Sequence, residues 1–158
     1  MAQTKSFIKV SGDEFRNPRF HEWVAENLYG KTRVVICVGG RTDINKEFFR
    51  RGFPVEKRSP TGREMETFEQ KQIQRDVLER NANELTNIFI EQGMYVTVII
   101  PFLDIGGELC PVDGDDMIRN AYIEYDQLYV ITSTGRKKEK EDKFAYLMPK
   151  VKVLAFDW

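Results

Sequence analysis

Short apolar runs alternate along this chain with longer segments whose apolar residues recur at helical spacing. The runs cover residues 7–10, 33–38, 95–100, 128–132 and 151–156. Continuous apolar runs of this length are typical of strands buried on both faces of a sheet, whereas half-exposed strands alternate. We therefore predict five strands at these positions.

The segments between the first strands predict two helices. The first begins at Pro18, a residue favoured at the first helical position, and ends at Gly30. The second is capped by Thr42 or Asp43 and ends at Gly52.

Two more helices are expected later in the chain. The longest helical stretch covers residues 64–92, with an apolar stripe along it, and a short helix covers residues 115–125. Loops are expected at residues 54–62, 104–116 and 135–143. Strands that alternate with helices predict βαβ units, and hence an α/β fold: a three-layer αβα sandwich with a mainly parallel central sheet.

Composition narrows the class of protein. The 158 residues predict one domain over residues 1–158, and 41% hydrophobic residues can form a core. A net charge of −1 argues against a nucleic acid or a membrane surface as partner. The sequence lacks a secretory signal pattern and an apolar run that could span a membrane, so we expect a cytoplasmic protein. The two cysteines, without metal-ligand spacing, are expected to be reduced thiols.

Two of the predicted strands end in glycine loops. The first runs into Ser11 and Gly12 behind Lys9, and the second runs into Gly39 and Gly40. Glycines at the carboxyl edge of a parallel sheet let the backbone approach an anion closely. A solvent-facing strand lysine and a tight turn are the alternative explanations, and the Walker and dinucleotide glycine patterns are absent.

Other polar residues have both a structural and a functional interpretation. Arg63 before the long helix is either a surface residue or an anion ligand. The carboxylates of residues 113–116 either cap a helix or orient lysines and Mg²⁺ around a phosphoryl group. The mixed charges of residues 136–143 predict a solvated loop, with a phosphate clamp as the alternative. His21, the one histidine, is expected to be structural, which excludes histidine-based triads.

In chain order, these motifs resemble the amino acid kinase superfamily, which includes acetylglutamate and uridylate kinases. Residues 7–12 resemble its opening strand and lysine–glycine loop, and residues 34–53 its second glycine loop and helix. Residues 61–67 are similar to an arginine-bearing acceptor segment, and residues 111–132 to the late aspartate motif and strand. Residues 146–151 are similar to a stretch that supplies a phosphate-binding lysine.

The resemblance implies an ATP-dependent kinase that uses Mg²⁺ and phosphorylates a carboxylate or phosphate. The implied catalytic residues are Lys9, Asp115 and Lys150. The implied nucleotide-binding residues are Lys9, Ser11, Gly12, Thr132 and Lys150. The implied acceptor-binding residues are Gly39, Gly40, Arg41, Arg63 and Asp113. No protein-held metal site is implied. Family members dimerise through helices near the sheet edge, so a homodimer is also implied, although core packing explains the stripe of residues 64–92 equally well.

The chain departs from the family pattern in three places. Arg41 stands where the second loop usually has a third glycine, and Pro111 and Asp113 replace the asparagines of the late motif. The chain is also shorter, so we expect it to lack the hairpin-bearing middle after Ile99 and most of the adenine-binding region after Thr132. Three functions stay open: a minimal phosphotransferase, a non-catalytic nucleotide- or anion-binding module, and an assembly protein that uses only the scaffold.

Overall fold

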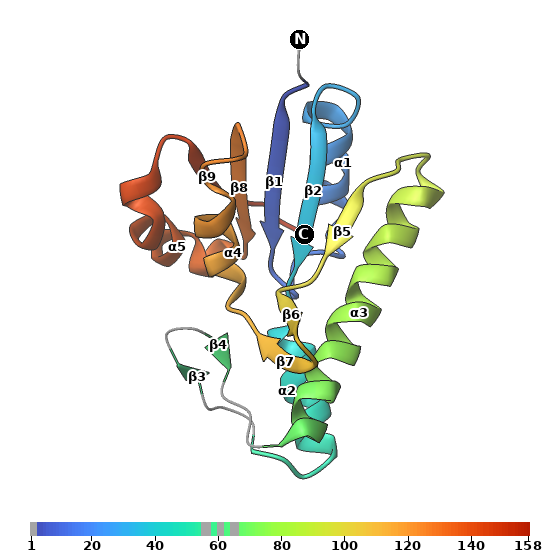
Figure 1. The fold of residues 1–158 in the computed structure, drawn as a ribbon. Coiled ribbons are helices and arrows are strands. Elements are labelled where there is room, and N and C mark those ends of the chain that lie inside the picture. Colours follow the sequence, from blue (N-terminus) through green and yellow to red (C-terminus); the bar gives the residue numbers. More distant parts are fainter. Residues whose placement is uncertain (1–2, 55–57, 60–61, 64–66) are drawn as a thin grey trace.

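A parallel sheet of five strands forms the centre of the protein (Figure 1). The computed structural model describes residues 3–54, 58–59, 62–63 and 67–158, and of residues 58–59 and 62–63 only the backbone. The strands of the sheet are, in spatial order, β5 (Thr97–Ile99), β2 (Arg33–Val38), β1 (Lys5–Val10), β8 (Gln127–Thr132) and β9 (Val151–Ala155). All five predicted strands are thus confirmed, each within two residues of its expected bounds.

Helices cover both faces of this sheet. The helices of the described chain are α1 (Pro18–Asn27), α2 (Arg41–Arg50), α3 (Phe68–Glu91), α4 (Gly114–Ala121) and α5 (Lys137–Phe144), of which α2 lies beyond the ends of the strands (Figure 1). On one face, Ile8 of β1 packs in a cluster with α1 and with Phe89 of α3. On the opposite face, Phe7 packs with Ile118 of α4 and Phe144 of α5. Successive strand residues point to opposite faces, and this alternation produces the predicted three-layer αβα sandwich.

A third apolar cluster lies beyond the carboxyl ends of the strands. Ile44 and Phe48 of α2 pack there against Ile73 and Val77 of α3 and against a hairpin (Figure 1). Helix α3 therefore buries its apolar stripe in two clusters, at its start under α2 and near its end under the sheet. It begins with a capping box in which Thr67 and Gln70 satisfy each other's backbone N–H groups. The first predicted residues of this helix, 64–66, lie outside the described residues.

The predictions of loops at residues 104–116 and 135–143 are wrong. Residues 104–116 contain a hairpin of β6 (Phe102–Ile105) and β7 (Glu108–Pro111), closed by Gly106 and Gly107 with positive φ. The chain therefore retains a hairpin directly after Ile99, where we expected its loss. Residues 135–143 form the short 3₁₀ segment η1 (Thr134–Arg136) and then α5. Opposite charges four residues apart, such as Lys138 and Asp142, pair along α5 and favour the helix.

The remaining elements are small. Strands β3 (Arg58–Ser59) and β4 (Gly62–Arg63) pair antiparallel within the expected loop 54–62, and η2 (Ala145–Leu147) follows α5. Met148 and Pro149 are joined by a cis peptide bond. Among the helices that the structure describes, none combines the length and the apolar character that crossing a membrane requires.

Candidate functional site

A pocket of about 350 Å³ opens at the carboxyl edge of the sheet. The loops after β1 and β2, the helices α3 and α5, and the start of α4 contribute to its wall. The wall carries five basic side chains, Lys9, Arg41, Arg136, Lys140 and Lys143, and four acidic ones, Asp13, Asp113, Asp115 and Glu139. Its volume lies in the range of small-molecule sites, and its position is where open α/β sheets bind ligands.

The two glycine loops touch each other at the floor of this pocket. A Cβ atom added at Gly12 would lie 2.7 Å from Gly40 Cα and 2.9 Å from Gly40 N. Such distances are too short for any side chain, so glycine is required at position 12. Backbone hydrogen bonds fix both loops to the sheet: Ser11 N–H donates to Ile131 O at 3.0 Å, and Gly39 N–H donates to Val10 O at 2.9 Å. The predicted anion loops are therefore one joined surface.

Helix α2 begins directly at the second loop. Gly40 is its N-cap residue and supplies no side-chain cap, so the first turn presents backbone N–H groups and the positive end of the helix dipole. Gly40, Arg41 and Ile44 all line the pocket. A helix N-terminus of this kind favours an anionic ligand.

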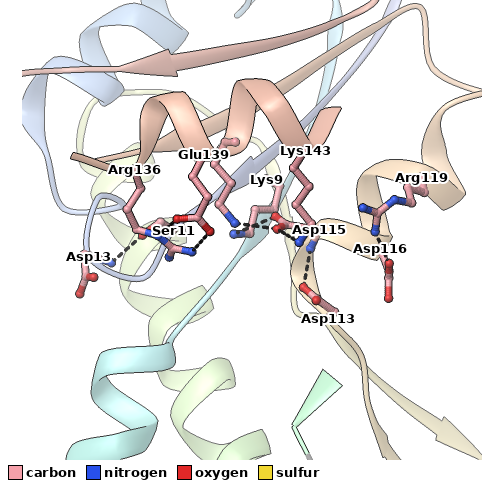
Figure 2. A network of polar contacts seen from close by, with 11 residues as sticks. Lys9, Ser11, Asp13, Asp113, Asp115, Asp116, Arg119, Arg136, Glu139 and Lys143 are labelled. Atoms are coloured by element: carbon pink, nitrogen blue, oxygen red, sulfur yellow. Dashed lines mark hydrogen bonds and ion pairs between the residues drawn. The ribbon is translucent and has the colours of Figure 1, made fainter. Parts of the chain in front are cut away.

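Asp115 holds three lysines beside these loops (Figure 2). Its Oδ2 accepts hydrogen bonds of 2.6 Å from Lys140 Nζ and from Lys143 Nζ, and its Oδ1 lies 3.5 Å from Lys9 Nζ. The Asp115 side chain is 3% exposed, and Lys140 is nearly as buried at 6%. One buried carboxylate thus gathers ammonium groups from β1 and α5, two elements distant in sequence.

The charges of this cluster shift the pKa values of its members. Burial by itself raises the pKa of Asp115, but the charges of Lys9 and Lys140 and the two lysine hydrogen bonds outweigh it, so the pKa lies well below its usual range. Burial, together with the nearby Lys9 charge, lowers the pKa of Lys140 despite its contact with Asp115. Asp115 therefore stays ionised at neutral pH and keeps the lysines in place.

At the start of α4 the acidic residues divide between capping the helix and contacting lysines. Asp113 is the N-cap, and its Oδ1 accepts a hydrogen bond of 2.9 Å from Asp115 N–H. Asp116 pairs with Arg119. Asp115 alone of the three reaches the lysines. A Cβ atom at Gly114 would lie 2.7 Å from Lys9 Cε, so the glycine between the two aspartates lets Lys9 pass close to the helix.

The pocket wall also has apolar side chains. Ile44, Leu78, Pro101 and Val112 line it together with the buried side chain of Gln74, whose Oε1 has no hydrogen-bond partner among the described residues. Burying an amide oxygen without a partner is costly. The wall therefore offers apolar surface as well as charged groups to a ligand.

The structure brings most of the predicted site residues together. Those that line the pocket are Lys9, Ser11, Gly12, Gly39, Gly40, Arg41, Asp113 and Asp115. Thr132 is buried at the end of β8 and does not line it. Arg63 lies in β4, and its side chain is outside the described residues.

Lys150 is not brought into this pocket. Residues 151–155 form β9, parallel to β8, so Lys150 precedes the strand and lies at the amino edge of the sheet. There it donates a hydrogen bond to Tyr122 O, lies 4.5 Å from the centre of the Tyr122 ring, and lines a different pocket. The strand predicted after Lys150 is thus confirmed, and its parallel pairing sets Lys150 at the edge opposite to the glycine loops.

Two of the three lysines that reach Asp115, Lys140 and Lys143, were not among the predicted site residues. With Arg136, the residue before α5, they are spaced four and three residues apart, which places the three side chains on one side of this helix. That spacing was a usable signal, but a loop was expected at 135–143, and the structure has a helix there. The phosphate clamp that was the alternative for this run stays a prediction.

His21 and Cys37 lie in the core. His21 Nε2 is 2.6 Å from Phe15 O, and burial lowers the pKa of its ring. Burial raises the pKa of the Cys37 thiol to about 12. Neither residue lines the pocket, in keeping with the structural role expected for His21.

Within the described ranges of the chain, no group of three His, Cys, Asp or Glu side chains is placed to hold a metal ion. No protein-family model matches the chain, and a comparison with curated proteins gives no match either. A function for this protein must therefore come from the chemistry of its pocket and from the motif resemblance.

Proposed function

We propose that this protein is an ATP-dependent phosphotransferase that acts on a small carboxylate- or phosphate-bearing acceptor, in the manner of amino acid kinases. The observation that carries the proposal is the contact of buried Asp115 with three lysines beside two joined glycine loops. Phosphoryl transfer needs mainly positioning and neutralisation of charge, and this cluster supplies both.

The charges of this cluster favour the binding of an anion. Three ammonium groups surround one carboxylate in this cluster, and the whole pocket wall has five basic side chains against four acidic ones. Lys140 is buried, although removing its charge from water costs free energy. A contact that serves only the structure does not explain this burial. An anionic ligand would complete the neutralisation.

The residues have distinct parts in the proposed transfer. An oxygen of the acceptor attacks the γ-phosphorus of ATP, the bond from that phosphorus to the β,γ-bridging oxygen breaks, and ADP leaves with that bond's electron pair. Lys9 and Lys140 neutralise charge on the transferring group and on the leaving group. Asp115 touches only the lysines and positions them, and the glycine loops let the backbone approach the phosphates.

The donor set also fits a magnesium ion carried by the nucleotide. Magnesium in such sites is held by phosphate oxygens and one or two carboxylates, and it neutralises phosphate charge. Asp13, Asp113 and Glu139 line the pocket and could supply these carboxylates.

A non-catalytic nucleotide- or anion-binding module on the same fold is the second candidate. Arg41 favours it, because a long cationic side chain at the start of α2 narrows the space for an acceptor. The two functions share the phosphate-binding cluster and differ in turnover.

A ligand screen followed by a turnover assay tests the proposal. Mg·ATP should raise the melting temperature, because a ligand at 100 times its Kd stabilises the native state by about 2.7 kcal/mol. ADP release with a panel of small carboxylates and phosphates then separates transfer from binding alone. Lys9→Ala should abolish both, while the control Lys150→Ala, which alters the lysine at the other sheet edge, should leave both intact. No thermal shift with any nucleotide or polyphosphate would refute both functions.

A further inference from the structure

Asn81 is a fully buried polar residue in the middle of α3. Its neighbours on the same helix face, Val77, Leu78 and Leu85, belong to the apolar core. Its Nδ2 donates a hydrogen bond of 3.2 Å to Gly39 O, in the second glycine loop. A buried amide costs free energy unless it makes such bonds. Its Oδ1 is buried without a partner among the described residues, so the bond to Gly39 is the one that this amide makes there.

That bond fixes the orientation of the peptide between Gly39 and Gly40. This peptide is trans, since the cis bond among the described residues is Met148–Pro149. In a trans peptide the C=O and the following N–H point in opposite directions. Because Gly39 O points to Asn81 of α3, the N–H of Gly40 points away from the Asn81 amide.

The Gly40 N–H is available to a ligand. Among the described residues it donates no hydrogen bond, and Gly40 itself lines the pocket. The bare backbone of Gly12 lies against the same peptide, since a Cβ added there would be 2.9 Å from Gly40 N. A side chain at position 12 would therefore collide with this peptide.

Asn81 also blocks other arrangements of the loop. A Cβ added at Gly40 would lie 2.9 Å from Asn81 Nδ2 and 3.2 Å from Leu78 Cδ2. The α3 side of the loop is therefore filled, and the peptide cannot move toward α3 without losing its hydrogen bond. The amide both orients and supports the loop.

We propose that Asn81 is a positioning residue: by holding the Gly39 carbonyl, it aims the Gly40 N–H at an anionic oxygen bound in the pocket beside the joined glycine loops. For phosphoryl transfer, which rests on the proposed function, that oxygen belongs to the phosphoryl group as it moves. A preoriented N–H of this kind stabilises charge in the transition state more than in the ground state.

The test compares Asn81→Asp with Asn81→Ala across pH. Asp keeps the shape but donates only when protonated, and burial raises the pKa of such a carboxyl. In a turnover assay, Asn81→Asp should lower kcat by about 100-fold with KM for ATP nearly unchanged. The defect should shrink as pH falls and the new carboxyl regains a proton. Asn81→Ala should show no such recovery, since it lacks a donor at every pH. An Asn81→Asp enzyme with wild-type kcat and pH profile would overturn the inference and leave the proposed function standing.

Inorganic pyrophosphate, used as the probe, separates this inference from the kinase proposal. If the wild-type protein binds pyrophosphate without any transfer, the proposed function fails. The inference then stands only if Asn81→Asp binds pyrophosphate more weakly, with recovery at low pH. A measurement on the wild-type protein needs no variant to fold: the amide resonance of Gly40 should move on addition of pyrophosphate. A Gly40 resonance that stays in place while pyrophosphate binds, or a protein that binds neither ATP nor pyrophosphate, overturns the inference.

Discussion

Two pockets with lysines lie at opposite edges of one sheet, and their lysines have different partners. At the carboxyl edge, Lys9 and Lys140 contact buried Asp115, beside loops that expose backbone N–H groups. At the amino edge, Lys150 contacts the carbonyl and the ring of Tyr122. The comparison teaches that a lysine becomes a candidate for catalysis through a buried charged partner. Its place in a motif is not sufficient.

The largest expected effect separates the two edges directly. Asp115→Asn removes the charge that holds three lysines, so phosphoryl transfer should fall by about 100- to 1000-fold. Breaking a buried ion pair also costs about 3–5 kcal/mol, which urea unfolding would measure. Lys150→Ala should change neither quantity by much, because Lys150 lies outside this pocket. Equal losses in the two variants would abolish the distinction between the edges.

The next effect concerns the contact between the glycine loops. Gly12→Ala would push a Cβ to 2.7 Å from Gly40 Cα, so the loops must separate. We expect a loss of about 1–3 kcal/mol in unfolding free energy and weaker binding of polyphosphate. Gly135→Ala is the matched control, since a Cβ there has no heavy atom within 4 Å. Calorimetric titration with pyrophosphate and thermal melts would check both, and a Gly12→Ala protein with native affinity would contradict the contact.

A smaller effect is the pH dependence that Asp115 contributes. The pKa of Asp115 is lowered on folding, so its stabilisation is complete above the ordinary carboxyl pKa and is lost as pH falls toward the lowered value. The stability difference between wild type and Asp115→Asn should be constant above about pH 5 and shrink in more acidic solution. Urea unfolding of the two proteins over a pH series isolates this contribution. A difference that grew on acidification would have the wrong sign for an ionised Asp115.

The smallest effect distinguishes the two lysines on α5. The side chain of Lys143 is 35% exposed and that of Lys140 is 6% exposed, although both bond to Asp115 at 2.6 Å. Because solvent screens the exposed charge, Lys143→Ala should lower turnover about tenfold or less, and Lys140→Ala about 100-fold. Steady-state kinetics would rank them, and the reverse order would place the reacting group nearer to Lys143.

The parts of the fold that could be predicted are those with a strong local pattern. The strands at 7–10 and 33–38 have continuous apolar runs, and Pro18 marks a helix start that the structure confirms. Helix α5 lacked such a pattern: it buries only Lys140 and Phe144, and its other residues are charged. When only one sequence is known, a helix that is stabilised by ion pairs and two buried residues has the same charged pattern as a solvated loop.

In the site, too, only the residues that a local pattern identifies could be predicted. Lys9, Gly12 and Gly39–Gly40 were identified because parallel strands end at one edge, a rule that operates along the chain. Asn81 could not be identified, because its function depends on Gly39, 42 residues away in sequence, to which α3 brings it. Lys150 was misplaced because the strand after it, β9, pairs parallel to β8 and so sets Lys150 at the amino edge.

The amino-acid order of this chain was enough to establish an α/β fold, five strands and two glycine loops, since apolar periodicity and backbone freedom are local properties. Which charges meet was decided only by the tertiary structure. Asp115 gathers Lys9, Lys140 and Lys143 because α4 and α5 pack on the same face of the sheet. The strength of a charge contact depends on distance and burial, and both arise only when distant segments pack together.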